Sequence, residues 1–372
     1  IESIVINQPD KFILESFSST KVSCFGGNDG SISAGTVSGG TAPYQYSLDG
    51  TNFSSNTEFN SLAVGNYTLY VRDANNCSIS TNIEITQPEQ LAMTTPISEN
   101  VSCFGGNDGS ISAGTVSGGT APYQYSLDGT SFSSNTEFNS LTAGNYTLYV
   151  RDANNCSIST NIEITQPEQL AMATPISENV SCFGERGGSI SAGTVSGGTA
   201  PYQYSLDGTS FSSNTEFNSL TAGNYTLYVR DANNCSISTN IEITQPEQLA
   251  MATPISENVS CFGERGGSIS AGTVSGGTAP YQYSLDGTSF SSNTEFNSLT
   301  AGNYTLYVRD ANNCSISTNI EITQPEQLAM ATPISENVSC FGERGGSISA
   351  GTVSGGTAPY QYSLDGTSFS SN

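Results

Sequence analysis

The sequence predicts an all-β protein built as a tandem array of small antiparallel β-sandwich domains. From residue 10 onward the chain repeats itself with a fixed period and few changes, so that residues 168–246 recur as residues 247–325. The length of one copy, residues 168–246, is typical of one small domain. Each copy contains six or seven short segments that alternate apolar and polar residues, with turn residues about every 8–12 positions. No segment shows the periodicity of a helix, which favours strands throughout.

The period also predicts the domain boundaries. Residues 168–246 are identical to residues 247–325, and residues 89–167 differ from both at four positions. The chain has no initiator Met and no signal peptide, so we expect it to be an interior slice of a longer protein. The expected organisation is the last strand of a preceding repeat (1–9), four complete repeats (10–88, 89–167, 168–246 and 247–325) and a truncated fifth repeat (326–372).

The first half of a repeat is expected to contain three strands, here numbered for residues 168–246. Leu170–Ser181 is predicted to be an edge strand that is interrupted at Pro175, because proline cannot donate a hydrogen bond to a neighbouring strand. The alternating segment Ser189–Val195 is predicted to be the next strand, and Pro201–Leu206 the third. In the third strand the tyrosines and the leucine are expected to lie on one face, and Gln203 and Ser205 on the other.

The second half of a repeat is expected to contribute the longest strands. Asp207-Gly208 predicts a tight turn, and phenylalanines anchor the Ser- and Asn-rich stretch that follows it. Leu220–Tyr225 has the spacing Leu-x-x-Gly-x-Tyr, which resembles the tyrosine corner of immunoglobulin-like (PKD-like) sandwiches. The strand Tyr225–Arg230 and the last strand, which alternates from Cys235 to Ile243, are expected to direct apolar side chains into the core.

The cysteines predict disulfide bonds, because two occur at the same places in each complete repeat. We favour pairing inside one domain, as between Cys182 and Cys235. The alternative across a junction, as between Cys235 and Cys261, would require extended strands to fold back sharply. Paired cysteines are typical of an extracellular or periplasmic compartment. The ninth cysteine, Cys340, would lack a partner. The predicted disulfide residues are Cys24, Cys77, Cys103, Cys156, Cys182, Cys235, Cys261 and Cys314.

Pairing inside one domain imposes a topological condition. Both cysteines must lie at the same end of the sandwich, so an even number of strands must separate them. Counting Ser210–Leu220 as one irregular strand gives four strands between the cysteines. Counting it as two gives five, which would place the cysteines at opposite ends.

Charge and composition exclude several functional classes. The net charge of −24 is expected to repel nucleic acids and anionic membrane surfaces, and no segment is apolar enough for membrane insertion. The chain contains no histidine, and its only lysines are Lys11 and Lys21, so no acid–base catalytic arrangement is indicated. We therefore expect no enzyme activity and no cofactor.

Calcium is the one metal that the sequence brings into consideration. Asn28–Gly30 and Asn107–Gly109 have the sequence Asn-Asp-Gly, which resembles the start of a calcium-binding loop, but they lack the further oxygen ligands of such a loop. Later repeats have Glu185-Arg186-Gly187 at this place, which introduces a positive charge. We interpret the segment as a surface turn.

Five motifs recur in the same order in each complete copy: Cys-Phe-Gly-x-x-x-Gly-Ser-Ile, Ser-Gly-Gly-Thr-Ala-Pro-Tyr-x-Tyr-Ser, Leu-x-x-Gly-x-Tyr, Asp-Ala-Asn-x-Cys and Ile-Thr-Gln-Pro. Together they resemble the SprB-type repeats of very large cell-surface adhesins of Bacteroidota. The Glu-Arg-Gly of the later copies departs from the usual Asn-Asp-Gly of that family.

The resemblance implies a repetitive stalk of a secreted adhesin filament on the outer surface of a Gram-negative cell. It also implies gliding motility, export by type IX secretion, attachment to external surfaces or polysaccharide, and contact with outer-membrane machinery through regions outside this chain. Two alternatives remain open. Each repeat is a weak glycan- or surface-binding module that acts by avidity, or the repeats assemble into an extracellular filament.

Overall fold

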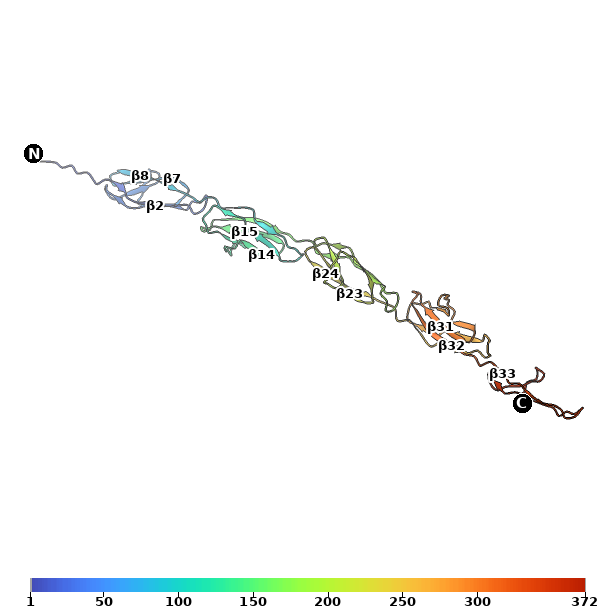
Figure 1. The fold of residues 1–372 in the computed structure, drawn as a ribbon. Helices are drawn as coiled ribbons and strands as arrows, with labels where there is room; N and C mark the ends of the chain where they lie inside the picture. The colour runs from blue at the N-terminus through green and yellow to red at the C-terminus, as the bar shows by residue number, and fades with distance from the viewer. Residues whose placement is uncertain (1, 372) are drawn as a thin grey trace. The chain divides into compact units, whose positions relative to one another are not determined.

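The computed structural model describes residues 2–371, and within that range it contains β-strands and no helix (Figure 1). The chain separates into two compact units, which are described separately. The first holds the residues up to Ala171 together with Ser196–Ala200 and Asp231–Cys235, and the second holds the remainder. The all-β prediction is therefore confirmed.

Each complete repeat in the first unit contains two three-stranded antiparallel sheets and a small two-stranded ladder. In repeat 1 (residues 10–88) the sheets have the orders β2-β3-β6 and β5-β7-β8, and β1 pairs with β4. Repeat 2 (residues 89–167) has the same arrangement. The strands are β1 (Ile13–Leu14), β2 (Phe17–Thr20), β3 (Gly30–Ala34), β4 (Val37–Ser38), β5 (Gln45–Ser47), β6 (Glu58–Leu62), β7 (Gly65–Arg72), β8 (Ser78–Ile85), β9 (Ala92–Met93), β10 (Ile97–Glu99), β11 (Gly109–Ser112), β12 (Val116–Ser117), β13 (Gln124–Ser126), β14 (Glu137–Leu141), β15 (Gly144–Arg151) and β16 (Ser157–Ile164).

Repeats 3 (residues 168–246) and 4 (residues 247–325) contain the same elements in the same order. The segment from residue 326 onward, repeat 5, contains four short strands. The strands are β17 (Ala171–Met172), β18 (Ile176–Glu178), β19 (Gly188–Ser191), β20 (Val195–Ser196), β21 (Gln203–Ser205), β22 (Glu216–Leu220), β23 (Gly223–Arg230), β24 (Ser236–Ile243), β25 (Ala250–Met251), β26 (Ile255–Glu257), β27 (Gly267–Ser270), β28 (Val274–Ser275), β29 (Gln282–Ser284), β30 (Glu295–Leu299), β31 (Gly302–Arg309), β32 (Ser315–Ile322), β33 (Ala329–Met330), β34 (Ile334–Glu336), β35 (Ser347–Ser349) and β36 (Val353–Ser354).

The core of a repeat lies between its two sheets. In repeat 4 the long antiparallel pair of β31 and β32 runs in register from Gly302 opposite Ile322 to Arg309 opposite Ser315. This pair contributes Leu306 and Val308, which are fully buried against Ile269 of the other sheet. Alternation with a period of two places these side chains on one face, as the sequence predicts.

The tyrosine corner is present in each complete repeat. In repeat 2 the Tyr146 hydroxyl donates a hydrogen bond to the backbone carbonyl of Thr142, four residues earlier, over 2.9 Å. Tyr67, Tyr225 and Tyr304 make the equivalent bond. This bond fixes the approach to the long strand, as it does in immunoglobulin-like sandwiches, so the predicted fold class is confirmed.

One strand prediction needs correction. The predicted strand Ser189–Val195 is divided into β19 and β20, with a break between them. In the third strand both Tyr204 and Ser205 are buried, although alternation places them on opposite faces. The Ser205 hydroxyl donates to the Asp207 carboxylate and accepts the backbone N–H of Gly208, so the last residue of β21 also holds the turn that follows it.

The edge strand around Pro175 and the irregular stretch Ser210–Leu220 determine how many times the chain crosses the sandwich. The interruption at Pro175 is confirmed, because β17 ends before it and β18 begins after it. The stretch Ser210–Leu220 crosses the sandwich twice: Ser212 bridges Tyr204, and β22 then returns along the other sheet. Five crossings therefore separate the two cysteines of a repeat, and the cysteines lie at opposite ends.

The segment predicted as the last strand of a preceding repeat contains no strand over residues 2–9. The equivalent segment of repeat 1 is the end of β8, and β8 is held by its pairing with β7. A strand needs a neighbour to complete its backbone hydrogen bonds. Residues 2–9 have no such neighbour in the described structure, so they remain outside the sheets.

Candidate functional site

The disulfide bonds join consecutive repeats rather than closing one domain. Three are present, and in each the two cysteines are 132 residues apart with Cα atoms separated by 5.6 Å. The first cysteine of one repeat bonds to the second cysteine of the next. The predicted pairing inside one domain is therefore wrong, and so is the alternative between adjacent cysteines across a junction. The pairs are Cys24–Cys156, Cys103–Cys235 and Cys182–Cys314.

Two cysteines that were predicted to form disulfides do not form one. Cys77 and Cys261 are exposed free thiols, as is Cys340. A partner at the observed separation of 132 residues would lie before residue 1 for Cys77 and beyond residue 372 for Cys261 and Cys340. The observed separation therefore gives none of these three cysteines a partner within residues 1–372.

The physical reason for the correction is the odd number of crossings. The two cysteines of repeat 2 lie at opposite ends, so Cys103 bonds forward to Cys235 and Cys156 bonds back to Cys24. Bonding them to each other would require the chain to cross the domain an even number of times. Each disulfide at a junction therefore joins one cysteine from each of two consecutive repeats.

A buried aspartate positions the second cysteine of each repeat. In repeat 2 the Asp152 side chain, 2 % exposed, accepts backbone N–H groups from Thr120, Asn154 and Cys156 over 2.8–2.9 Å. Three amide donors satisfy the carboxylate and hold the Asp-Ala-Asn-Asn-Cys turn in place. In the sequence this turn is visible as the recurring motif Asp-Ala-Asn-x-Cys, but the motif does not reveal the role of its aspartate.

Asp73 is the equivalent residue of repeat 1, and hydrogen bonds to its carboxylate oppose the effect of burial on its pKa. Burial acts to raise the pKa of Asp73, but hydrogen bonds from the backbone amides of Cys77, Thr41 and Asn75 outweigh it. The pKa of Asp73 therefore lies below the ordinary value for an aspartate, so the carboxylate remains ionised at neutral pH.

An asparagine of the same turn reaches the preceding repeat. The Asn154 side-chain amide donates to the backbone carbonyl of Ser23, over 3.0 Å, beside the Cys24–Cys156 bond. Asn233 and Asn312 make the same bond to Ser102 and Ser181. Each complete junction therefore combines one disulfide with one side-chain hydrogen bond. The Asp-Ala-Asn-x-Cys motif was the signal in the sequence, but its partner lies in another repeat.

The loop that carries the first cysteine is braced by the linker. The backbone N–H of Gly26 donates to the side-chain oxygen of Gln87, over 2.7 Å, immediately before the linker proline. Gly184 and Gln245 repeat this contact in the second unit. The Ile-Thr-Gln-Pro motif thus ends a strand and also fixes the loop that forms the next disulfide.

The Asn-Asp-Gly loop differs between copies in its hydrogen bonds. Asp29 accepts both the hydroxyl and the backbone N–H of Ser23, and Asp108 does the same with Ser102. The Ser23 hydroxyl bond and then its amide bond lower the pKa of Asp29. Glu-Arg-Gly replaces this aspartate in repeats 3 to 5. No group of three or more potential metal-ligating side chains lies together within residues 2–371.

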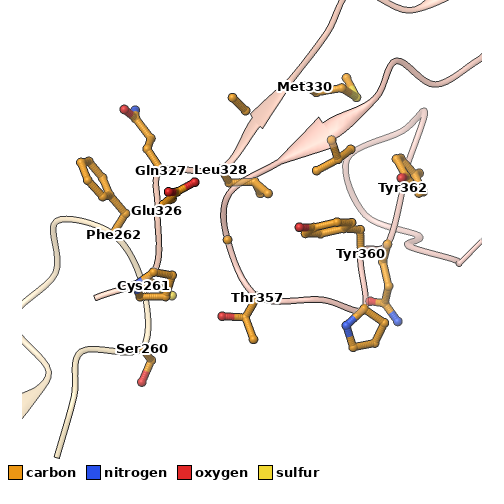
Figure 2. A pocket seen from close by; sticks show the side chains of 16 residues that line it. Ser260, Cys261, Phe262, Glu326, Gln327, Leu328, Met330, Thr357, Tyr360 and Tyr362 are labelled. Atoms are coloured by element: carbon orange, nitrogen blue, oxygen red, sulfur yellow. The ribbon is translucent and has the colours of Figure 1, made fainter. Parts of the chain in front are cut away.

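The junction between repeats 4 and 5 has a different lining, because residues 326–372 include no counterpart of Cys314. Figure 2 shows Cys261 and Phe262 on one side of a pocket, and Leu328 and Tyr360 on the other. Glu326, at the start of repeat 5, lies between them. At the junction of repeats 3 and 4, Asn312, Cys314 and Ile316 contribute to the corresponding lining.

Aromatic side chains of repeat 3 make structural contacts. The Tyr228 ring covers the turn at Gly208, where an added Cβ would lie 3.3 Å from the ring. The Arg230 guanidinium stacks over Phe211 at 4.1 Å and donates to the Gln203 side chain. These contacts close the outer face of β21 and β23.

No helix in the described residues is long and apolar enough to span a bilayer.

Comparison with known protein families gives one match. A family model described as the SprB repeat matches five segments, which together cover about half of the chain. No curated protein sequence matches the chain. The matched segments are residues 16–53, 95–132, 174–211, 253–290 and 332–369.

Solved structures show similarity at low sequence identity. The chain matches the eight N-terminal Ig domains of Down Syndrome Cell Adhesion Molecule with 12 % identity and a TM-score of 0.29, covering 86 % of this chain and 49 % of that one. It thus spans about half the length of that structure. A Ca²⁺-stabilised adhesin with which an Antarctic bacterium binds ice matches with 14 % identity and a TM-score of 0.42, covering 84 % and 99 %. The human desmocollin-1 ectodomain matches with 11 % identity and a TM-score of 0.25, covering 84 % and 79 %.

Proposed function

Because the chain belongs to the SprB repeat family, we propose that it is part of the stalk of a very large secreted adhesin. The stalk extends from the outer surface of a Gram-negative cell and serves gliding motility and attachment to external surfaces or polysaccharide. Its role is structural rather than catalytic. Export by type IX secretion and contact with the outer-membrane machinery belong to other regions of the protein.

The observation that carries this proposal is the covalent link between consecutive repeats. A disulfide can stabilise any folded module, but a bond that joins two modules also fixes their junction, and a stalk must keep its junctions closed under load. The bonds Cys24–Cys156 and Cys182–Cys314 supply that resistance. They also favour an extracellular location, because the cytosol keeps thiols reduced.

Binding by each repeat, with avidity from copy number, is the second candidate. The repeated array is the feature that favours it, because linked weak sites gain effective concentration. The two functions are separated by presenting the purified chain to the glycans and surfaces that intact cells hold. Retention of the chain would favour binding modules, and its absence would favour a stalk.

The decisive experiment for gliding is to label these repeats on living cells and record the label over time. A label that moves along the cell surface while the cell glides is the expected result. A label that stays fixed, or that decorates shed fibres, would contradict the motility proposal and favour a static adhesin or a filament coat. A label on an unrelated outer-surface protein of the same cells serves as the control for passive drift.

A further inference from the structure

The disulfide connectivity provides a covalent path that omits most of the backbone. From Cys24 the path crosses to Cys156, follows the backbone to Cys182, and crosses again to Cys314. The middle bond, Cys103–Cys235, spans positions that overlap both of the others. It belongs to a second path of the same kind, offset by one repeat.

We propose that this connectivity makes the array a tether of nearly fixed length, in which a pull along the chain is carried by disulfides and short backbone segments. The segment between consecutive bonds on one path runs from Cys156 to Cys182. It contains β16, the linker, β17 and β18. The residues between Cys24 and Cys156, and those between Cys182 and Cys314, lie inside closed covalent loops, so their backbone is not part of this path.

The greatest possible extension of the chain can be compared with and without the disulfides. A fully extended chain spans at most about 3.6 Å per residue, so the segment from Cys156 to Cys182 reaches about 90 Å. Two whole repeats without the bonds would reach about 570 Å on the same basis. The disulfides therefore reduce the greatest extension to about one-sixth, apart from the few ångströms that each bond adds.

The connectivity also separates the backbone that tension can extend from the backbone that it cannot. The core residues Ile111 and Leu148 of repeat 2 lie between Cys24 and Cys156 in sequence, inside the first loop, so the backbone there cannot be extended until a bond breaks. Tension does act on β16, which lies on the path and pairs with β15. Packing therefore decides when β16 leaves the sandwich, and the disulfides decide how far the chain can then extend.

This inference concerns the array itself and does not depend on gliding or on adhesion. It goes beyond a stabilising role for the disulfides, because it assigns different effects to bonds of identical chemistry. A bond that only stabilised its junction would act alike at every position. A bond on the load path controls length, and a bond off that path does not.

The test is single-molecule stretching of the whole chain, held through terminal tags that carry no cysteine, at forces that unfold β-sandwiches. The chain has 371 residue-to-residue steps. The two bonds that do not overlap each remove 132 of them. We therefore expect a limiting length that corresponds to 107 steps, about 390 Å. With a thiol reductant the limit becomes 371 steps, about 1,300 Å.

The variants give the sharpest result. Removing the middle bond with Cys103→Ser and Cys235→Ser leaves both non-overlapping bonds, so the limit stays at 107 steps. Removing an outer bond with Cys182→Ser and Cys314→Ser raises the limit to 213 steps, about 770 Å. The shortest path then uses both remaining bonds and the backbone between them, from the second cysteine of repeat 2 back to the first. Cys340→Ser changes an unpaired cysteine and is the matched control without effect.

Two outcomes would overturn the inference. Pairing inside each repeat would make the Cys103→Ser and Cys235→Ser variant longer, since it would break one bond in repeat 2 and one in repeat 3. An oxidised chain that reaches the same length as the reduced chain would show that no bond lies on the load path. Neither outcome bears on whether labelled repeats move on cells, so the two proposals fail separately.

Discussion

Repeats 4 and 5 place one sequence in two environments. Residues 247–293 and 326–372 are identical, and within residues 1–372 only the first of these segments is followed by the second half of the sandwich. Val259 and Ile269 are 2 % and 0 % exposed in repeat 4, whereas the same residues in repeat 5, Val338 and Ile348, are 46 % and 60 % exposed. The first half of a repeat therefore forms no closed core by itself.

The second half provides the missing cover. In repeat 4, β31 and β32 supply Leu306, Val308 and Ile322, each at most 1 % exposed. The segment matched by the SprB family model in this repeat, residues 253–290, ends before these strands. The recognisable motif and the folding unit are thus different lengths of chain.

Local structure is retained in both environments. β34 pairs with β35 in the register in which β26 pairs with β27, with Ile334 opposite Ser349 as Ile255 is opposite Ser270. Short-range backbone hydrogen bonds form wherever the local sequence allows them. Burial, in contrast, requires a partner surface.

The largest expected effect comes from completing repeat 5. Adding the sequence of residues 294–325 after Asn372 should bury Val338 and Ile348, each worth about 1.5–3 kcal/mol. Amide hydrogen exchange over residues 326–371 should then slow to the rates of repeat 4. An extension with the same residues in scrambled order is the control, and equal exchange with both extensions would contradict the comparison.

The next largest effect is expected from shortening the same isoleucine in repeat 4 and in repeat 5. Ile269→Ala should reduce the free energy of unfolding of repeat 4 by about 2–5 kcal/mol, because it removes a fully buried side chain. Ile348→Ala, at the identical position of repeat 5, should change stability by less than about 0.5 kcal/mol. Local unfolding free energies from amide exchange would measure both, and equal losses would refute the assignment of the core.

The buried aspartate is expected to matter less than the core. Asp310→Asn keeps the shape of the side chain but weakens its bonds to the amides of Thr278, Asn312 and Cys314, at a cost of about 1–3 kcal/mol. Exchange of the Cys314 amide should accelerate. Glu321→Gln, on an exposed position of β32, is the control and should leave that exchange unchanged.

The smallest difference is expected at the Asp-Gly turn. Hydrogen bonds from the Ser284 hydroxyl and the amides of Ser289 and Thr288 lower the pKa of Asp286, and the equivalent bonds lower the pKa of Asp365. Both carboxylates should titrate below the ordinary value of 3.8 and at nearly the same pH, as carboxyl NMR would show. Clearly different titrations would mean that the turn depends on the rest of the sandwich.

The sign of the pH effect follows from the lowered pKa. A carboxylate with a folded-state pKa below its unfolded value contributes stability above the unfolded pKa, and this is lost as the pH falls through the folded pKa. The stability of the complete repeats should therefore be constant near neutral pH with respect to these turns and decline below about pH 4. Thermal unfolding between pH 7 and pH 3 would measure the decline.

The sequence by itself determined the features that depend on neighbouring residues. Alternation with a period of two identified the long strand that includes Leu227 and Val229, and the spacing Leu-x-x-Gly-x-Tyr identified the bond of the Tyr225 hydroxyl. The turn at Asp207 and the break at Pro175 were equally accessible. Backbone sterics and local hydrogen bonds set these features, and they act within a few residues.

Only the tertiary structure decided how the cysteines pair. The partner of Cys103 depends on the end of the sandwich at which it lies, and that depends on whether Ser210–Leu220 and its equivalents cross once or twice. Its partner, Cys235, belongs to another repeat, where the Asn233 side chain completes the contact. No local pattern encodes a contact between residues 132 positions apart, because that contact exists only when two folded repeats meet.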